Sequence, residues 1–366
     1  MKKVLIVTLF GNYNYGNKFQ NYAMQEVLKK YQLDVCTLDT QKIFQSTYEK
    51  VSFVKRLKNL SIKNVIKKLN DIRNRTINTK RALGFINFSN KYIKMNEYIS
   101  DEKLKKEFDF VCIGSDQVWK PEALNSHYAY AHFHDSNNVF AYAPSFGISN
   151  IADEYVEKLK NGLKNVKNIS VREQRGAEIV KEISGRDAEV VVDPTMLLTT
   201  EEWDSIIMKP AEIPEKEFIV TYFLGNYSKK RRKYIKKFAK KNNLVIVDLG
   251  QVDYKKYYCS DPGEFLYFIK HAKIIFTDSF HGTVFSILYR KPFYAMNRED
   301  DLLSMSSRIE TLLNKFDLKE RIINNYNQEI SFEIDFKNID ESLKFEREKS
   351  DKYLKKALNA DNVKTF

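Results

Sequence analysis

Three residues with side chains suited to proton transfer or anion binding follow apolar runs that predict strands. Asp116 comes shortly after the run Phe108–Ile113, and Arg172 directly follows the run Ile169–Val171. His281 follows the short apolar run Ile274–Phe276, at the start of a helix predicted over Phe280–Tyr289. A carboxylate can accept a proton from a hydroxyl, a guanidinium binds carboxylate or phosphate, and an imidazole transfers protons near neutral pH. Together these residue types indicate proton transfer on a substrate that carries an anionic group.

Each of these residues also has a structural interpretation. Asp116 is suited to cap the helix that follows it, and Glu173 is suited to pair with Arg172. Ser279 is a candidate N-cap, which places His281 in the first helical turn. Because a helix N-terminus disfavours the imidazolium form, His281 needs a phosphate or carboxylate nearby to act as an acid at neutral pH.

A loop rich in Gly and Asn, Gly11–Asn17, joins a strand predicted over Val4–Leu9 to a helix predicted over Phe19–Lys30. The backbone N–H groups of such a loop and the helix N-terminus favour an anion or a polyol. The pattern is not GxGxxG, so a dinucleotide site is only weakly indicated. A plain connecting turn is the alternative interpretation.

The histidines His127, His132 and His134 are close together in the sequence, and His132 and His134 would share one face of a strand. A metal site would need a third ligand with suitable geometry. The chain carries no P-loop, no HExxH pattern and no nucleophile elbow. We therefore predict no metal and no cofactor.

Short apolar runs alternate with helical patterns along most of the chain, which is typical of βαβ units and parallel sheets. Residues 196–216 carry Pro210 and Pro214 among charged residues and indicate a connection between domains. We predict an α/β fold with one Rossmann-like domain over residues 1–198, a second over 199–330 and a helical tail over 331–366. The ligand site is expected between the carboxyl ends of the strands of the two domains.

The positive charge of the chain is concentrated in one segment. The 366 residues contain 61 Lys and Arg against 48 Asp and Glu, a net charge of +13. Between Lys50 and Met95 there are 13 Lys and Arg and one acid, Asp71, which predicts a basic helical insertion over about residues 45–98. A second basic stretch, Lys229–Lys241, contains no acid.

Apolar residues recur in the basic segment at helical spacing, as at Ile62, Val65, Ile66, Leu69 and Ile72. The pattern predicts an amphipathic basic helix with two open interpretations. Its apolar side covers the protein's own core, or it docks on an anionic membrane surface. Nucleic acid is disfavoured because no recognition module or aromatic stacking platform accompanies the charge.

The compartment is predicted from what the chain lacks. Three widely separated cysteines with no CxxC pair fit a reducing environment. The apolar run near the N-terminus is short for a signal peptide and no small-residue cleavage site follows it. No stretch approaches the roughly 20 apolar residues of a membrane span. We expect a cytoplasmic protein, or a peripheral one on the inner face of the cytoplasmic membrane.

Seven short strings, taken in order and spacing, resemble the polysaccharide pyruvyl transferase family from the N-terminus to about residue 325. The strings are Asn14-Tyr15-Gly16 before Gln20-Asn21-Tyr22-Ala23, Ile113-Gly114-Ser115-Asp116-Gln117-Val118-Trp119, Ala141-Tyr142-Ala143-Pro144-Ser145-Phe146-Gly147, Ser170-Val171-Arg172-Glu173, Val192-Asp193-Pro194-Thr195, Asp278-Ser279-Phe280-His281-Gly282 and Arg290-Lys291-Pro292-Phe293.

The resemblance implies a GT-B-like fold, in which two Rossmann-like domains face each other across a cleft and a C-terminal helix crosses back. It also implies transfer of the enolpyruvyl group of phosphoenolpyruvate onto two hydroxyls of a sugar. The sugar belongs to a cell-surface polysaccharide precursor, often lipid-linked, and phosphate is released. By the same resemblance His281 matches the active-site histidine and Arg172 a donor-binding arginine.

One position departs from the family pattern. Many relatives have Arg-Leu-His where this chain has Ser279-Phe280-His281, so the positive charge toward the donor must come from elsewhere, and Arg298 or Arg308 could supply it. We predict His281 as the acid and Asp116 as the base. The predicted donor-binding residues are Arg172, Ser279, Gly282, Arg298 and Arg308. The predicted acceptor-binding residues are Asn14, Tyr15, Asn17, Ser115 and Gln117.

Two other functions stay open on the sequence. One is a GT-B glycosyltransferase that uses a nucleotide sugar, which the serine at position 279 favours. The other is a non-catalytic protein that binds polyanions at the membrane. The oligomeric state is not predicted.

Overall fold

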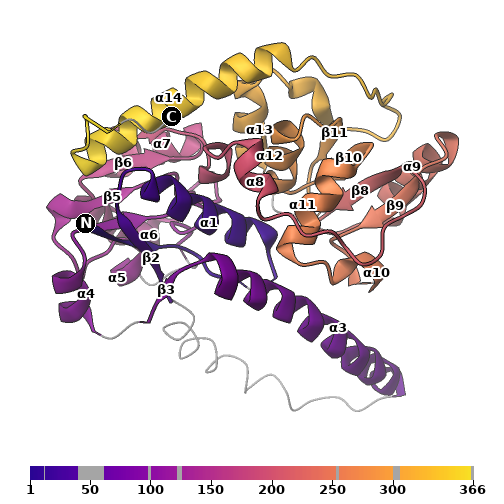
Figure 1. Cartoon of the computed structure of the whole chain (residues 1–366), viewed down its shortest axis with the longest axis horizontal. Helices are drawn as coiled ribbons and strands as arrows, with labels where there is room; N and C mark the ends of the chain where they lie inside the picture. Colours follow the sequence, from indigo (N-terminus) through magenta and orange to yellow (C-terminus); the bar gives the residue numbers. More distant parts are fainter. Residues whose placement is uncertain are drawn as a thin grey trace.

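The computed structural model describes residues 1–11, 13–39, 62–97, 100–121, 126–252, 255–299 and 306–363, and Figure 1 shows their arrangement. Two parallel β-sheets, each flanked by helices, form the two halves of the molecule. The strands of the first sheet all precede residue 191, and those of the second all follow residue 217. The predicted domain boundary at 198/199 lies between them.

The first sheet has seven parallel strands in the order β3-β2-β1-β4-β5-β6-β7. In the central register Leu5 lies opposite Cys36 on one side and Val111 on the other. Strands buried on both faces are apolar along their whole length, as Val4 to Val7 are. The bounds are β1 Lys3–Val7, β2 Asp34–Leu38, β3 Met95–Asn96, β4 Phe110–Ile113, β5 Val139–Ala141, β6 Asn168–Val171 and β7 Glu189–Val190.

Helices connect these strands. They are α1 Tyr15–Lys29, α3 Ile62–Tyr92, α4 Asp101–Glu107, α5 Ser126–Ala129, α6 Asp153–Lys164 and α7 Gln174–Ser184. The prediction that the first helix begins at Phe19 was wrong by four residues. The Asn14 side chain accepts a hydrogen bond from the Gly16 N–H and caps α1, so the helix begins at Tyr15 and includes the end of the predicted loop.

The second sheet has five parallel strands in the order β12-β11-β10-β8-β9. Their bounds are β8 Phe218–Tyr222, β9 Val245–Asp248, β10 Ile274–Thr277, β11 Phe293–Met296 and β12 Ile322–Ile323. The helices after residue 199 are α8 Thr200–Asp204, α9 Lys229–Lys241, α10 Lys255–Tyr258, α11 Pro262–His271, α12 Phe280–Leu288, α13 Ser306–Lys315 and α14 Lys337–Leu358. Every residue of α12 is buried, so this helix is central to the second half.

One hydrophobic cluster joins the two halves. Tyr15 and Phe19 of α1 pack against Tyr222, Phe265 and Phe285 of the second half, with ring centroids 4.2 to 5.6 Å apart across the two halves. A shared apolar core of this kind holds two domains in one relative orientation.

The last helix, α14, starts beside the second half and ends over the first sheet (Figure 1). Arg290 pairs with Asp340 near its start at 2.9 Å, and Tyr353 near its end donates a hydrogen bond to the Ala141 carbonyl at 2.7 Å. Arg347 donates to the Met196 and Leu198 carbonyls between these points. Two facing parallel sheets with a returning C-terminal helix confirm the predicted GT-B-like α/β fold.

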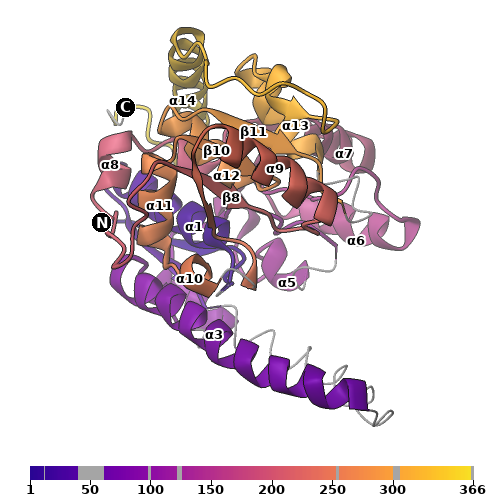
Figure 2. The same ribbon diagram turned by 90° about the vertical axis from the view of Figure 1, so that its right-hand side faces the viewer.

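The basic insertion contains the long helix α3, which extends away from the body at its N-terminal end (Figures 1 and 2). Nearer its C-terminal end it packs against the body. Arg81 is buried there and donates to the carbonyls of Tyr13, Leu249 and Tyr258. The end of the predicted insertion is not helical, because Met95–Asn96 pairs with β2 as the edge strand β3. The side chains of the predicted apolar stripe, Ile62 to Ile72, lie outside the described residues.

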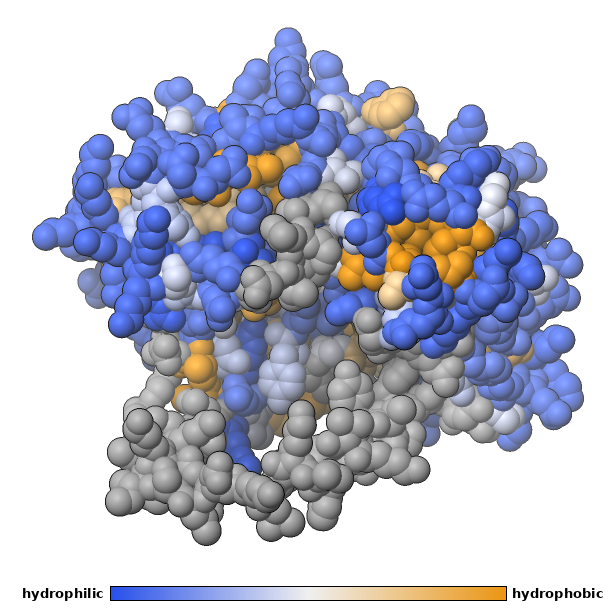
Figure 3. Space-filling model, turned by 180° about the vertical axis from the view of Figure 1, so that it is seen from behind, coloured by the Kyte–Doolittle hydropathy of each residue, from blue (hydrophilic) through white to orange (hydrophobic). Residues whose placement is uncertain are grey.

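Seen from behind, the surface is mostly hydrophilic and is interrupted by a compact hydrophobic patch over the half that holds the first sheet (Figure 3). Among the described residues, no helix combines the length and the apolar character needed to cross a membrane.

Candidate active site

The carboxyl ends of the two sheets meet at Asp193, which follows β7. The Asp193 carboxylate accepts hydrogen bonds from Arg172 Nη1 at 2.7 Å and from Ser115 Oγ at 2.8 Å, both from the first half. Its other oxygen lies 3.5 Å from Nε2 of His281, which belongs to the second half. Asp193 is fully buried. It therefore connects a guanidinium and an imidazole that come from opposite halves of the molecule.

The fold brings His281 to this point because α1 approaches it closely. A Cβ added at Gly16 would lie 2.1 Å from Nδ1 of His281, so only glycine fits there. His281 is itself buried, in the first turn of α12. Within the described residues its Nε2 has no hydrogen bond, and the Asp193 carboxylate is its charged neighbour. This carboxylate is the counter-charge that an imidazolium at a helix N-terminus requires.

Buried charges set the ionisation of the cluster. Burial favours the neutral acid at Asp193, but the charges of His281 and Arg172 outweigh it and hold its pKa far below its usual range. Burial alone would lower the pKa of Arg172, but the carboxylates of Asp193, Asp116 and Glu173 raise it. Asp193 and Arg172 therefore remain an ion pair across the neutral pH range.

Glu173 lies behind Arg172. Its carboxylate accepts from Ser145 Oγ at 2.7 Å, and its other oxygen lies 4.0 Å from Arg172 Nε. Burial raises the pKa of Glu173, despite the nearby guanidiniums of Arg172 and Arg308. The contact with Arg172 is an ion pair and not a hydrogen bond.

Asp116 is the second carboxylate at the meeting point. It accepts a hydrogen bond from Asn17 Nδ2 of α1 and lies 3.4 Å from Arg172 Nη2 and 4.0 Å from Arg308 Nη1. Its backbone φ of 67° falls in the left-handed region, which is uncommon for a non-glycine residue and is found at functional sites. The strand end of β6 and the helices α1 and α13 thus all place polar groups on this carboxylate.

Arg308 belongs to the cluster. It is buried, and burial together with the charge of Arg172 lowers its pKa to about 10, so it is protonated at neutral pH. With the Gln117 amide oxygen turned toward it, Gln117 accepts from Nη2 and Nη1 of Arg308 at 3.1 and 3.3 Å. The predicted residues Asn17, Ser115, Asp116, Gln117, Arg172, His281 and Arg308 therefore lie together in the structure.

Three of the predicted binding residues cap a helix or allow close packing of the backbone. Ser279 is the N-cap of α12, and its hydroxyl accepts from the Gly282 N–H at 3.3 Å. Gly282 lies against β10, where a Cβ would be 2.5 Å from Thr277 Oγ1. Asn14 caps α1 with its side chain.

Tyr15, predicted to bind the acceptor, lies in the core and not at a surface. Its ring is fully buried in the aromatic core between the halves, and its hydroxyl donates to the Ser260 carbonyl at 2.7 Å. Burial raises the pKa of this phenol to about 12. In this structure Tyr15 joins the two halves and has no surface toward an acceptor.

Arg298 lines a pocket next to the cluster. It lies in the loop after β11 and lines this open pocket with Lys230 and Arg231. Its positive charge is near enough to contribute to the lowered pKa of Arg308. Asp278 is three residues before His281 in the sequence, and its Oδ2 lies 3.9 Å from Nη1 of Arg231 in the pocket. Its carboxylate accepts hydrogen bonds from the backbone N–H groups of Leu224 and Gly225. The two arginines considered as donor ligands, Arg298 and Arg308, are thus in different environments.

The clustered histidines have other partners. His127 Nε2 pairs with Asp101 at 2.7 Å, and His134 Nε2 contacts the Phe108 carbonyl at 2.8 Å. His132 and His134 lie in a turn after α5 and not on the predicted strand. In the described ranges no group of three or more His, Cys, Asp or Glu is arranged to hold a metal ion.

Sequence reasoning did not select Asp193, the residue on which the cluster converges. The signal was present, because Asp193 follows the apolar run Val190–Val192 just as Arg172 follows its own strand. The same rule, a polar residue directly after a predicted parallel strand, would have found it. Its pairing with His281 across the two halves could not be derived from sequence spacing.

The arrangement is suited to proton transfer in a water-poor environment. A buried imidazole beside a carboxylate can hold or release a proton, and Asp116 offers a second proton acceptor. The guanidiniums of Arg172 and Arg308 can bind an anionic group between the two halves.

Solved structures of similar shape are remote in sequence. S. aureus MnaA solved with UDP is 12% identical, with 98% of each chain covered and a TM-score of 0.45. The UDP-N-acetylglucosamine 2-epimerase of Rickettsia bellii is 11% identical, with 98% of this chain and 96% of that chain covered and a TM-score of 0.43. Acinetobacter baumannii MurG is 11% identical, with 98% and 94% covered and a TM-score of 0.38. No curated protein matches the chain.

The family comparison is more specific. The model of the family described as polysaccharide pyruvyl transferase matches residues 14–300, which include Asp116, Arg172, Asp193 and His281 and lack Arg308. The match covers more than half of the chain, and this protein therefore belongs to the polysaccharide pyruvyl transferase family.

Proposed function

We propose that the protein transfers the enolpyruvyl group of phosphoenolpyruvate onto two hydroxyls of a sugar in a cell-surface polysaccharide precursor. The product is a cyclic pyruvate ketal, and phosphate is released. Membership of the family supports a polysaccharide acceptor. Phosphoenolpyruvate as donor is what the family resemblance implies, and the guanidinium groups of the buried cluster are of the type that its carboxylate and phosphate need.

The reaction needs no external oxidant or reductant. The methylene carbon of the donor gains a proton and becomes a methyl group, which leaves an oxocarbenium-like centre at the neighbouring carbon. One sugar hydroxyl adds to that carbon and loses its proton, the bond to the phosphate oxygen breaks, and the second hydroxyl adds to close the ketal. Of the two hydroxyl protons, one replaces the proton delivered to the methylene and the other leaves with phosphate.

The residues divide these tasks between the halves. His281 delivers the proton to the methylene carbon and then assists the departing phosphate. Asp116 accepts the proton of the attacking hydroxyl. Arg172 and Arg308 face the negative charge of the donor, which takes over part of the pairing that the carboxylates now provide. Asn17 and Gln117 hold Asp116 and Arg308 in place and are the proposed neighbours of the acceptor.

The observation that carries this proposal is the convergence of His281 and Arg172 on Asp193. A proton donor and an anion-binding guanidinium that come from opposite halves lie on one buried carboxylate. This convergence supports the proposal, because a small anionic substrate held between the sheets would meet both groups.

The test is an assay with purified protein, phosphoenolpyruvate and a matched saccharide acceptor. It follows phosphate release and the mass gain of one pyruvyl ketal on the acceptor. We expect activity in the wild type and its loss in His281→Ala and Arg172→Lys, each checked for folding by circular dichroism. Stabilisation by a nucleoside diphosphate together with no turnover of phosphoenolpyruvate would instead assign a nucleotide-sugar reaction.

We also propose that the enzyme works at the inner face of the cytoplasmic membrane on a lipid-linked acceptor. The support is the basic insertion, whose helix α3 extends from the body (Figures 1 and 2). Anionic lipid attracts such a segment at low salt. Co-sedimentation with vesicles that contain anionic lipid tests this, and equal binding to neutral vesicles would contradict it.

A further inference from the structure

A second site candidate is the pocket that Arg298 lines, at the carboxyl ends of β11 and β12. The pocket has a volume of about 310 Å³, close to the lower end of the range of about 300–1,000 Å³ for small-molecule sites. Three cationic side chains line it, namely Lys230 and Arg231 of α9 and Arg298 of the loop after β11. Its floor is apolar, with Met296 and Ile323.

Two arginines of this pocket each have a guanidinium nitrogen without a hydrogen-bond acceptor among the described residues. Arg231 is 2% exposed, and its Nη1 makes no hydrogen bond among the described residues. Oδ2 of Asp278 lies 3.9 Å from this atom, which is an ion-pair contact beyond hydrogen-bond distance. Nε of Arg298 likewise makes no hydrogen bond in the described part of the chain. A buried guanidinium N–H without an acceptor is costly, and a ligand oxygen in the pocket would remove that cost.

One carboxylate, Glu299, lies at the pocket. It accepts from the backbone N–H and the hydroxyl of Ser228 at 3.0 and 2.8 Å and from Tyr326 Oη at 2.5 Å. Its oxygen is also 3.7 Å from Nε of Arg231. Glu299 and Asp278 therefore offset two of the three positive charges, and a surplus of one positive charge remains.

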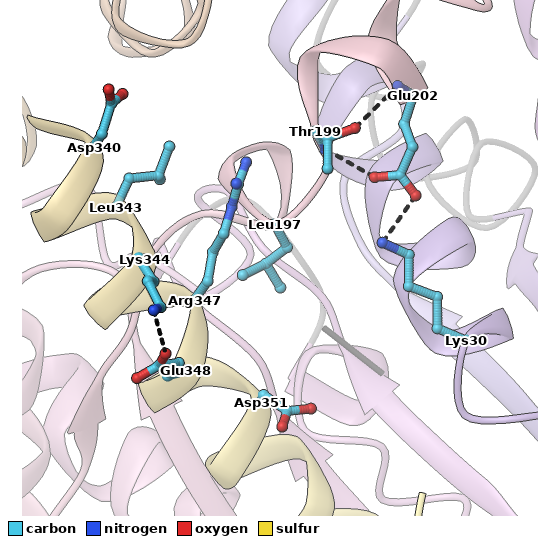
Figure 4. A pocket seen from close by; sticks show the side chains of 10 residues that line it. All are labelled: Lys30, Leu197, Thr199, Glu202, Asp340, Leu343, Lys344, Arg347, Glu348 and Asp351. Carbon is cyan, nitrogen blue, oxygen red and sulfur yellow. Dashed lines mark hydrogen bonds and ion pairs between the residues drawn. The ribbon is translucent and has the colours of Figure 1, made fainter. Parts of the chain in front are cut away.

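A pocket of similar type but without this surplus provides the comparison. The pocket between α14 and α8, of about 560 Å³, also contains Lys and Arg side chains (Figure 4). There Lys30 pairs with Glu202 of α8 at 2.8 Å, and Nε and Nη2 of Arg347 donate to backbone carbonyls. These contacts hold α8 and α14 in place, and the pocket also contains the carboxylates of Glu202, Asp340, Glu348 and Asp351, so it shows no surplus of positive charge.

Four asparagine side chains in the pocket indicate which other groups a ligand would carry. Asn297, Asn324, Asn325 and Asn327 line the same pocket as the cations. Amide groups donate to and accept from hydroxyls, and guanidinium and ammonium groups bind phosphate oxygens. We propose that this pocket binds the phosphate group of a small hydroxyl-bearing molecule beside the reaction centre. The ligand is the phosphoryl end of the donor, or the diphosphate of a nucleotide or a lipid-linked saccharide.

The test measures binding without turnover, so its outcome does not depend on the proposed transfer activity. Inorganic pyrophosphate, uridine diphosphate and phosphoenolpyruvate are each titrated into the full chain by calorimetry. We compare the wild type with Arg298→Gln, with Lys230→Ala and with the control Lys233→Ala. Lys233 is an exposed residue on the same helix and outside the pocket, so this control removes the same charge.

We expect Arg298→Gln and Lys230→Ala each to weaken anion binding by about tenfold, the effect of one charge-assisted hydrogen bond, and Lys233→Ala to change it by less than about twofold. Weaker binding of pyrophosphate and uridine diphosphate alone identifies a diphosphate ligand. Weaker binding of phosphoenolpyruvate as well identifies the donor. The proposal is overturned if none of the three anions binds, or if the control variant weakens binding as much as the two pocket variants.

Discussion

The buried cluster around Asp193 and the open pocket beside Arg298 lie at neighbouring strand ends but treat charge in opposite ways. In the cluster, Arg172 and Arg308 face the carboxyl groups of Asp116, Glu173 and Asp193. In the pocket, Lys230, Arg231 and Arg298 face Glu299 and Asp278, whose oxygens lie 3.7 and 3.9 Å from Arg231. Matched charges hold side chains in fixed positions, and surplus charges attract a ligand. The comparison separates a region in which each arginine already faces carboxylates from one in which a positive charge remains for a ligand.

The most severe way to break the cluster is to remove its proton carrier. We expect His281→Ala to lower kcat/KM by on the order of 10³-fold, within the range for general acid catalysis. The thermal unfolding temperature should change little. His271→Ala is the matched control, because His271 is exposed at the end of α11 and bonds only to the Tyr267 carbonyl in the described residues. Retention of more than about a tenth of the activity in a folded His281→Ala protein would contradict the assignment.

The next effect tests the charge that connects the two halves. We expect Asp193→Asn to lower kcat/KM by about 100-fold and the free energy of unfolding by about 3 kcal/mol, since Arg172 loses its buried counter-charge. The pH profile of kcat/KM should also change, because a negative charge 3.5 Å from Nε2 of His281 is removed. A variant that loses stability while keeping the pH profile would give Asp193 a structural role only.

The stability of the same variant has a predictable pH dependence. The pKa of Asp193 is lower in the folded than in the unfolded state, so its ionised form stabilises the fold above its unfolded pKa of about 3.9. This contribution is lost as the pH falls below that value toward the folded pKa. Between about pH 5 and pH 3 the wild type should therefore lose more stability than Asp193→Asn. Denaturant unfolding at each pH measures the difference, and parallel losses would contradict it.

The sequence was sufficient for the parts of this comparison that depend on local order. Strand ends predicted the positions of Asp116, Arg172 and His281, because parallel strands all present their carboxyl ends to one edge. It failed where a contact joins distant segments. The burial of Tyr15 against the second half depends on how the halves pack, and no spacing along the chain encodes that.

The dependence of the kinetic constants on salt distinguishes the pocket from the cluster. An open pocket with surplus cations is screened by ions, whereas a buried, matched cluster is screened much less. Raising sodium chloride from about 0.05 M to about 0.5 M should therefore raise KM for the phosphate-bearing substrate about three- to tenfold and change kcat by less than about twofold. Steady-state kinetics at a series of salt concentrations measure both constants. A fall in kcat at constant KM would place the screened charges in the cluster.

The smallest expected effect is that of Tyr15→Phe, which tests whether Tyr15 joins the two halves or binds the acceptor. Tyr15→Phe removes a hydroxyl that donates to the Ser260 carbonyl at 2.7 Å and accepts from Nη1 of Arg81 at 3.1 Å. We expect a loss of about 1–2 kcal/mol in the free energy of unfolding, since two buried groups each lose a partner. KM for the acceptor should stay within about twofold of the wild type, because the ring remains in the aromatic core. Tyr13→Phe is the control, because Tyr13 is exposed and only its backbone carbonyl accepts from Arg81. A raised acceptor KM with unchanged stability would return Tyr15 to the acceptor site and leave Arg81 as the residue that joins the halves at this point.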